Sequence, residues 1–303
     1  MSTPWLQNAL AQLAKNPVQG YNATTSAAAE PTALTALALL VHRQPRQALP
    51  ALQWLASKQL PSGAVPVLEE QDEPCWTTSL ALMAWQYYHA EYRARNDSPT
   101  QLPSFERQTE LAIRWSLAMR GEIIDSDDVG HNTRLTGWPW VAGTHSWLEP
   151  TALHVIALKA AGHGEHPRVR EAIQLLADRL LPNGGCNYGN VVVLGQVLKP
   201  HPQPSGVVLL ALANEDRLAP NVTTKLEKTR QYLVETLPII RSADSLAWIL
   251  LGLAAHNEDA PETDQQIAAV ASEEIRRGGP LYRLALLALA SRRAAGPLHG
   301  RFA

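Results

Sequence analysis

The stretch from Asp125 to Glu149 contains the densest group of side chains in this sequence that could carry out chemistry. It opens with three carboxylates, Asp125, Asp127 and Asp128. Carboxyl groups that cluster in a pocket of low dielectric raise one another's pKa, so the central Asp127 could stay protonated and donate a proton to an alkene or epoxide. We therefore name these three as candidate catalytic residues, and a solvated turn or helix cap is the competing interpretation.

Two histidines in the same stretch are the other candidate catalytic residues. His131 and His145, with the nearby carboxylates, have the chemistry to bind a divalent metal, but their spacing matches no compact ligand motif. Hydrogen bonds that order the loop are the alternative use. We therefore predict no metal ligand and no cofactor, with zinc or magnesium kept as the alternative. Arg134 and Glu149 are assigned to substrate binding.

A second stretch, 182–190, combines glycines, which permit tight backbone turns, with amide side chains that donate and accept hydrogen bonds. Asn187, Tyr188 and Asn190 could hold a polar head group, so we predict that they bind substrate. Turn formation is the alternative, and it explains the glycines fully. Cys186 could act as a nucleophile, although a small packing residue is the simpler interpretation.

A repeated helical element must position these stretches. The pentapeptide Glu-Pro-Thr-Ala-Leu occurs at 30–34 and again at 149–153. Each copy opens an apolar run that is hydrophobic on nearly every face, which is typical of a helix buried on all sides. Looser copies begin at Glu73, Gln203, Ser242 and Gly279.

More polar segments alternate with these copies, and their apolar residues recur at the spacing of an amphipathic helix. Each pair of segments predicts a hairpin of one outer amphipathic and one inner apolar helix, about six hairpins in all. The last copy is apolar rather than polar, which favours closure of a ring against the first hairpin. We therefore predict an all-α fold, an α/α toroid, with residues 1–303 as one domain. The outer helices are expected near 5–13, 48–56, 105–117, 169–180, 222–237 and 263–275.

Such a ring places every loop from an outer to an inner helix at one rim. Three of these loops are long, 60–74, 121–149 and 182–203, and long loops in compact domains often carry function. Four tryptophans lie in or beside them, where they could line a substrate pocket or else only hold the loops in place. They are Trp76, Trp138, Trp140 and Trp147.

Two segments carry a resemblance to a known family. Residues 51–63 read Ala-Leu-Gln-Trp-Leu-Ala-Ser-Lys-Gln-Leu-Pro-Ser-Gly, and residues 172–185 end in Leu-Pro-Asn-Gly-Gly. Both resemble the repeat of the prenyltransferase and squalene-oxidase repeat proteins, in which an outer helix is followed by a short Pro-x-Gly turn. The resemblance implies the α/α toroid of terpene cyclases and protein prenyltransferase β subunits. It also implies an isoprenoid or a similar apolar small molecule in the central cavity.

The same resemblance implies roles for individual residues. The string at 125–128 resembles the Asp-x-Asp-Asp signature of class II terpene cyclases, with Asp127 as the acid. Glu73-Pro-Cys75 is similar to the carboxylate-x-Cys zinc ligands of protein prenyltransferases. However, Glu-Pro-Thr occupies the same place in two other copies, which favours a variant of the repeat over a zinc ligand at Cys75.

Composition argues against several classes of function. A formal charge of −2 without a run of Lys or Arg predicts no binding to nucleic acid. No apolar run approaches the ~20 residues of a membrane-spanning helix, and the N-terminus lacks the pattern of a secretion signal. Two cysteines are too few for a disulfide framework. We therefore expect a cytoplasmic protein.

Two functions from different classes stay open, and the sequence leaves open whether the protein is an enzyme. The first is a cyclase or transferase that acts on an isoprenoid, favoured by the dense group of titratable side chains in 125–149. The second is a binding module, or a subunit with a protein partner, that recognises a lipid, peptide or glycan through its rim loops. Only two phenylalanines occur in the chain, which counts against a carbocation cavity lined by aromatic rings.

Overall fold

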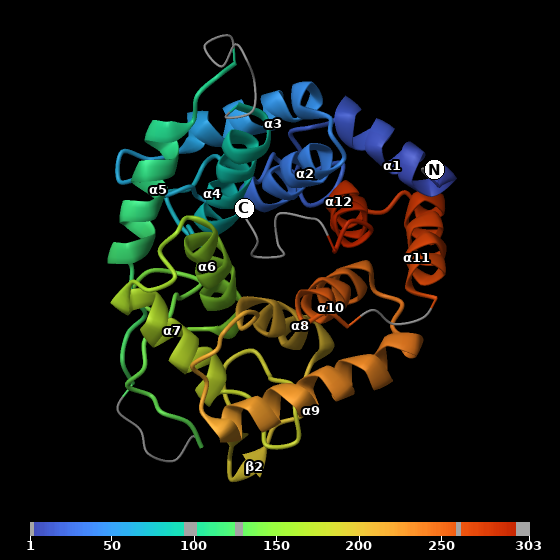
Figure 1. Cartoon of the computed structure of the whole chain (residues 1–303). Coiled ribbons are helices and arrows are strands. Elements are labelled where there is room, and N and C mark those ends of the chain that lie inside the picture. The colour runs from blue at the N-terminus through green and yellow to red at the C-terminus, as the bar shows by residue number, and fades with distance from the viewer. Residues whose placement is uncertain (1–2, 94–101, 125–129, 259–261, 295–303) are drawn as a thin grey trace.

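A computed structural model describes residues 3–93, 102–124, 130–258 and 262–294, and the α-helices in this part of the chain form a closed ring of two layers (Figure 1). The outer layer consists of α1 (Pro4–Lys15), α3 (Pro45–Lys58), α5 (Glu106–Ala118), α7 (Pro167–Asp178), α9 (Pro220–Thr236) and α11 (Thr263–Arg277). The inner layer consists of α2 (Ala29–Val41), α4 (Thr78–Tyr88), α6 (Leu148–Ala160), α8 (Pro202–Ala211), α10 (Ala243–Ala255) and α12 (Leu281–Ala290). Outer and inner helices alternate along the chain, so the predicted α/α toroid of six hairpins is confirmed.

The two layers follow from the two kinds of apolar pattern. The outer helix α1 buries only Trp5, Ala9, Leu10 and Leu13, which lie on one face of a helix. The inner helix α2 buries every residue from Pro31 to Val41, because other helices cover it on all sides. An amphipathic segment therefore faces solvent on one side, and a uniformly apolar segment has no place except the interior of the ring.

Proline marks the first turn of several inner helices. Pro31, Pro150 and Pro204 are each the third residue of their helix, where the missing N–H has no intrahelical partner to lose. Pro74, in the repeat copy that begins at Glu73, differs from these three, because α4 begins only at Thr78. The intervening residues form a turn in which the Thr78 N–H donates to Cys75 O at 3.0 Å, and this turn delays the start of the helix.

The ring closes between the last and the first hairpin, as the apolar last copy predicted. Helix α12 packs beside α2, and His42 Nε2 lies 3.0 Å from the carbonyl oxygen of Ala288. On the opposite rim, the rings of Tyr21 and Tyr282 meet edge to face with centroids 5.9 Å apart. Contacts therefore join the two ends of the chain at both rims.

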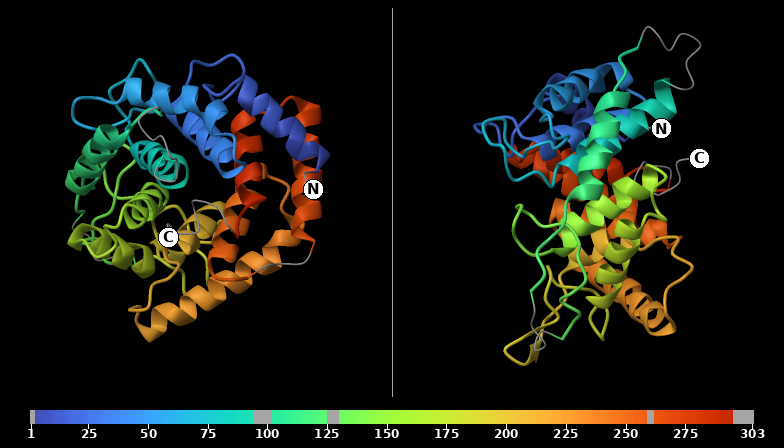
Figure 2. Two further views of the ribbon diagram at one scale, coloured as in Figure 1. Left: turned by 45° about the horizontal axis from the view of Figure 1, so that its top comes forward. Right: turned by 90° about the vertical axis from the view of Figure 1, so that its left-hand side faces the viewer.

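Three long loops, 59–77, 119–147 and 179–201, lead from an outer to the next inner helix and project from one side of the ring (Figure 2). The last of them carries a small antiparallel hairpin of β1 (Val192–Val193) and β2 (Gln196–Val197). Shorter elements complete the fold: the π-helix η1 (His89–Arg93) follows α4, and the 3-10 helix η3 (Leu237–Ile239) follows α9. All six inner helices begin at the rim that carries the long loops.

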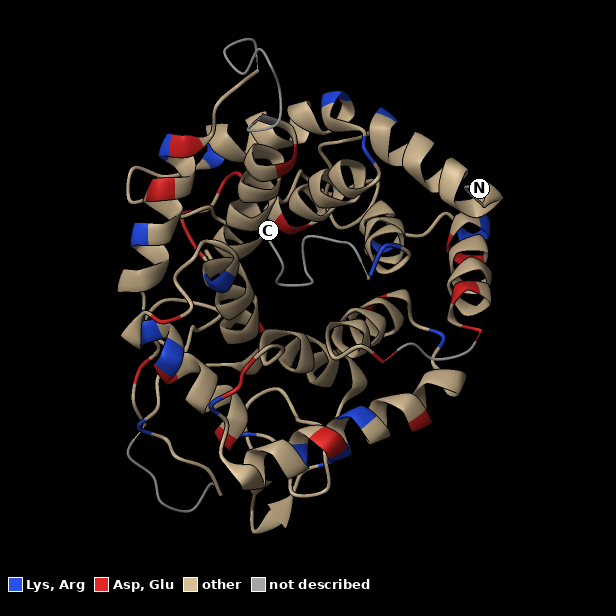
Figure 3. Ribbon diagram, viewed as in Figure 1, with Lys and Arg blue, Asp and Glu red and all other residues tan. Residues whose placement is uncertain are grey.

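Charged residues belong mainly to the outer helices and the loops, and the inner helices contain few of them (Figure 3). The inner helices contain only Glu30, Glu149, Lys159, Asp244 and Arg283. All of these except Lys159 lie in the first turn of their helix, at the rim of the long loops. Within the described part of the chain, no helix has the length and apolar character needed to cross a membrane.

Candidate active site

The second residue of an inner helix is the position that places polar groups around the ring. Glu30, Glu149 and Asp244 occupy it in α2, α6 and α10. Gln203 and Tyr282 occupy it in α8 and α12. Because the hairpins repeat around the ring, equivalent positions face a common region at the rim, and the charges of the three carboxyl groups act on one another there.

Glu30 is the most perturbed of the three carboxyl groups. Its pKa is raised to about 7, chiefly by burial; the hydrogen bond of Tyr21 lowers the pKa, and the charges of Glu149 and Asp244 raise it. The Tyr21 hydroxyl donates to Glu30 Oε2 at 2.7 Å. Burial also raises the pKa of Tyr21, so this phenol stays a donor at neutral pH. Glu30 is therefore a carboxyl group that holds its proton close to neutral pH.

Glu149 shares this environment, but it has a different partner. Gln203 Nε2 donates to its Oε1 at 2.8 Å across the α6–α8 contact. Burial raises the pKa of Glu149, the Gln203 hydrogen bond lowers it, and the charge of Asp244 raises it. The sequence assigned Glu149 to substrate binding, and its place in the carboxyl cluster is compatible with that assignment.

Asp244 is paired with an arginine. Arg283 Nε lies 3.1 Å from Asp244 Oδ2, and Arg283 Nη1 lies 3.6 Å from Glu274 Oε2. The neighbouring phenol of Tyr282 has its pKa raised by burial first and by the charge of Asp244 next. The rim therefore combines a carboxyl group that retains its proton, Glu30, with one that is ion-paired, Asp244, which are the two requirements for proton transfer in both directions.

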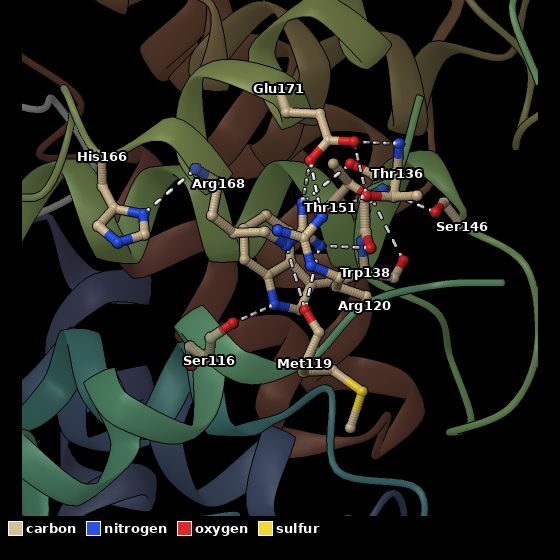
Figure 4. A network of polar contacts seen from close by, with 11 residues as sticks. Ser116, Met119, Arg120, Thr136, Trp138, Ser146, Thr151, His166, Arg168 and Glu171 are labelled. Carbon is tan, nitrogen blue, oxygen red and sulfur yellow. Dashed lines mark hydrogen bonds and ion pairs between the residues drawn. The ribbon is translucent and has the colours of Figure 1, made fainter. Parts of the chain in front are cut away.

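Arg168 of α7, whose side chain is almost fully buried, holds the described parts of the loop 119–147 in place (Figure 4). Its N–H groups donate to the carbonyl oxygens of Met119 (3.2 Å from Nε), Thr136 (2.9 Å from Nη1) and Gly137 (2.6 Å from Nη2). Its carbon Cζ also lies 4.0 Å from the ring centroid of Trp138. Burial lowers the pKa of Arg168 to about 10, which still leaves it charged at neutral pH.

The predicted tryptophans lie at two places along these loops. Trp138 is fully buried: its Nε1 donates to Ser116 O at 2.9 Å, and its ring stacks on His154 at 4.9 Å. Trp76 and Trp140 meet edge to face at 4.9 Å and border a cavity, whereas Trp147 packs against the ring of His145 at 4.8 Å. The two predicted uses, holding the loop and lining a pocket, are thus divided among the four rings.

The ring contact of the predicted site residue His145 is with Trp147 rather than with the carboxyl cluster. Asp125, Asp127 and Asp128 lie outside the described residues, and their assignment stays a prediction. His131 is half-buried and Arg134 is exposed. Burial, followed by the charge of Arg179, lowers the pKa of His145.

The stretch 182–190 is ordered largely by hydrogen bonds to neighbouring segments. Asn187 Nδ2 donates to Lys199 O at 2.9 Å, and its Oδ1 accepts the Tyr188 N–H at 2.8 Å. The Tyr188 ring lies 5.0 Å from that of His201, and Asn190 is exposed. The amide of Asn187 therefore supports the loop, and the substrate role of the three residues remains a prediction.

Neither cysteine is suited to the reactive roles that the sequence raised. Burial raises the pKa of both thiols, Cys75 and Cys186, to about 12, so neither is a thiolate at neutral pH. Cys75 Sγ donates to Asp72 O at 3.0 Å. Within the described residues, no group of three or more His, Cys, Asp or Glu side chains is placed to hold a metal ion.

Sequence reasoning missed Glu30 and Asp244 as site residues. The repeated pentapeptide contained the signal, because Glu30 and Glu149 occupy the same repeat position and charge is rare in the inner helices. A buried apolar helix tolerates a charge only where something compensates it, so a first-turn acid repeated in such helices indicates a shared site.

No protein-family model matches the chain, and no curated protein matches it. Solved structures with similar folds include Rex8A from Paenibacillus barcinonensis complexed with xylose, at 10% identity and a TM-score of 0.58, covering 98% of this chain and 93% of that one. A mutant of Rex8A, also complexed with xylose, gives a TM-score of 0.57 at 10% identity over 97% and 93% of the two chains. This likeness supports the α/α toroid, but it does not support the prenyltransferase assignment or its isoprenoid substrate.

Proposed function

We propose that the protein binds a glycan at the rim of the long loops and hydrolyses it by acid–base catalysis. The observation that carries the proposal is the pair formed by Glu30, whose pKa lies at about 7, and Asp244, which is ion-paired with Arg283. Glycosidases use two carboxyl groups in this way, one to protonate the leaving oxygen and one to activate water or attack the sugar. The sugar in the toroid of similar fold adds support for a carbohydrate ligand.

In this mechanism Glu30 is the general acid. Its burial keeps the proton in place near neutral pH, so Glu30 can transfer it to the glycosidic oxygen as the bond to the leaving sugar breaks. Tyr21, which donates to Oε2, orients the carboxyl group and stabilises the carboxylate that results. Asp244 is the base that accepts a proton from water, and Glu149 with Gln203 offers hydrogen-bonding groups to sugar hydroxyls.

The test compares Glu30→Gln and Asp244→Asn with wild type on a panel of xylo-oligosaccharides. Loss of general acid or base catalysis lowers turnover by about 10²–10⁴-fold, whereas sugar binding measured by calorimetry is retained. Glu165→Gln, at an exposed carboxyl group on the other rim, is the matched control and keeps full turnover. Wild type that cleaves no glycan, or variants with undiminished turnover, would overturn the proposal.

An isoprenoid substrate is the second candidate, favoured by the uniformly apolar inner helices below the carboxyl cluster. A protonated Glu30 could equally donate to an alkene. Farnesyl diphosphate is therefore included in the panel: its conversion, with loss in Glu30→Gln, would replace the glycan by an isoprenoid. If the wild-type protein binds sugar without cleaving it, the protein is a binding module instead of an enzyme.

A further inference from the structure

A cavity of about 430 Å³ lies between the rim loops 59–77 and 119–147, against helices α5 and α6. His154 of α6 is among its lining residues, five positions after Glu149. Five residues correspond to a rotation of roughly 140° about the helix, so His154 faces away from the side on which Glu149 meets the carboxyl cluster. The cavity is therefore a separate site from the cluster assigned to hydrolysis.

His154 brings an unpaired acceptor to this cavity. Its Nδ1 lies 2.8 Å from the carbonyl oxygen of Pro150, which requires the proton on Nδ1 and leaves a lone pair on Nε2. The side chain is 1% exposed, and Nε2 has no hydrogen-bond partner within the protein. Burial, with a smaller effect from the charge of Arg168, lowers the pKa of His154 to about 3. A neutral, buried acceptor without a donor is costly, and a ligand with an N–H or O–H group would satisfy it.

The remaining lining residues define the charge of that ligand. Four tryptophans, Trp76, Trp115, Trp138 and Trp140, line the cavity, and indole faces attract cations. Asp72 and Glu73 are exposed at the same cavity, and among its described lining residues there is no Lys or Arg. Aromatic walls with carboxylates favour a positively charged ligand over a neutral or anionic one, and Arg168 packs on the Trp138 ring without lining the cavity.

We propose that this cavity binds a protonated alkylamine, with one ammonium N–H donating to His154 Nε2. Its apolar stem packs against the tryptophans, and Asp72 and Glu73 attract its charge. A quaternary ammonium group has no N–H and would leave Nε2 unpaired, so the site distinguishes the two kinds of cation. The inference goes beyond the proposed hydrolysis and does not depend on it.

The experiment uses four probes that share one stem: butylamine, butyltrimethylammonium, butanol and butyrate. Binding is followed by the indole N–H signals of the tryptophans in NMR spectra of the whole chain. We expect butylamine to bind at least about tenfold more tightly than each of the other three, because only it combines charge with a donor. Butanol or xylose binding as tightly as butylamine would overturn the proposal in favour of a neutral polyol.

Variants separate the two parts of the recognition. His154→Phe removes the acceptor but keeps an aromatic ring to stack on Trp138. We expect this variant to bind butylamine about tenfold more weakly and to bind butyltrimethylammonium with unchanged affinity. The double variant Asp72→Asn with Glu73→Gln changes only exposed side chains, so it also serves if His154→Phe does not fold. The double variant should bind both cations more weakly, and the binding should depend less on salt concentration.

Two matched controls complete the design. Glu69→Gln alters a carboxylate of the same loop that does not line the cavity, and it leaves butylamine binding unchanged. Glu30→Gln abolishes the proposed hydrolysis but keeps amine binding, so failure of one proposal is distinguishable from failure of the other. Unaltered butylamine affinity in both His154→Phe and the double variant would overturn the assignment of the cavity.

Discussion

Gly206 of α8 and Gly252 of α10 lie in direct backbone contact, because a Cβ added to Gly252 would stand 2.5 Å from the carbonyl oxygen of Gly206. A Cβ on Gly206 would in turn meet backbone atoms of Trp248 at 2.6 Å. Helical backbone cannot rotate aside as a side chain can, so the close approach of these two inner helices requires glycine at both positions.

We predict that Gly252→Ala lowers the free energy of unfolding by about 1–3 kcal/mol, since the added methyl group forces α8 and α10 apart. Chemical denaturation of the purified protein measures this. Gly164→Ala is the matched control, because its Cβ would meet only the Lys159 side chain at 3.6 Å, and it should stay within about 0.5 kcal/mol of wild type. Equal stability of the two variants would contradict close packing at Gly252.

The raised pKa of Glu30 predicts a specific dependence of stability on pH. The folded protein keeps the Glu30 proton up to about pH 7, whereas the unfolded chain releases it near the ordinary value of 4.5. This group therefore makes the protein less stable as pH rises from about 4.5 to about 7, with no further change above that. Glu30→Gln has no such proton to lose, so its stability relative to wild type should increase as pH rises from about 4.5 to about 7. Above pH 7 its free energy of unfolding should exceed that of wild type by on the order of 1–3 kcal/mol.

Thermal unfolding at pH 5 and pH 8 measures the difference between Glu30→Gln and wild type. Glu165→Gln, which changes an exposed carboxyl group, should show the same offset from wild type at both pH values. If Glu30→Gln also showed a constant offset, Glu30 would titrate normally and would be unsuited to the role of general acid.

The hydrogen bond from Tyr21 changes the pKa of Glu30 in the direction opposite to burial. This bond lowers the pKa of Glu30 because it stabilises the carboxylate, so Tyr21→Phe should raise that pKa above about 7. Carbon-13 NMR titration of the glutamate side chains measures the shift. Tyr232→Phe removes a hydroxyl that donates instead to Pro200 O, and it should leave the Glu30 titration unchanged. A fall in the Glu30 pKa in Tyr21→Phe would refute the assigned direction of this bond.

The hydrogen bonds of Arg168 predict that this residue stabilises the loop 119–147. Arg168→Met removes donors to three backbone carbonyl groups, and we expect the free energy of unfolding to fall by at least about 2 kcal/mol. Limited proteolysis should cut this loop faster than in wild type. Arg217→Met changes an exposed arginine paired with Glu165 and should have little effect on either measurement. A loop that resists protease equally in both variants would argue against its attachment through Arg168.

The ring of helices could be predicted because its signals are local. Apolar residues at helical spacing mark α1, and an unbroken apolar run marks α2, and each pattern lies within about fifteen residues. The start of α4 could not be predicted, because Pro74, at the repeat position, is followed by a turn instead of by the helix. In that turn the Thr78 N–H donates to Cys75 O.

The candidate site could be predicted only in part, because its members are far apart in the chain. Glu30 and Asp244 come together only when six hairpins close into a ring, and no local pattern reports which face of each helix points to its axis. The sequence directed attention to the dense loop 125–149, where chemistry-bearing residues are neighbours. Glu149, at the end of that stretch, is the one residue shared by the prediction and the cluster.

The parallel order of the inner helices gives the two ends of the inner layer opposite partial charges. Each peptide dipole adds along its helix, so six aligned helices present partial positive charge at the rim of Glu30, Glu149 and Asp244 and partial negative charge at the other. Lys159 reflects the second effect: its ammonium group donates to the carbonyl oxygens of Ala211 and Ala213 at the end of α8, at 3.2 and 2.7 Å. The outer helices run the opposite way, so the effect is local to the inner layer, where an anionic group formed at the first turn of an inner helix is stabilised by the backbone as well as by side chains.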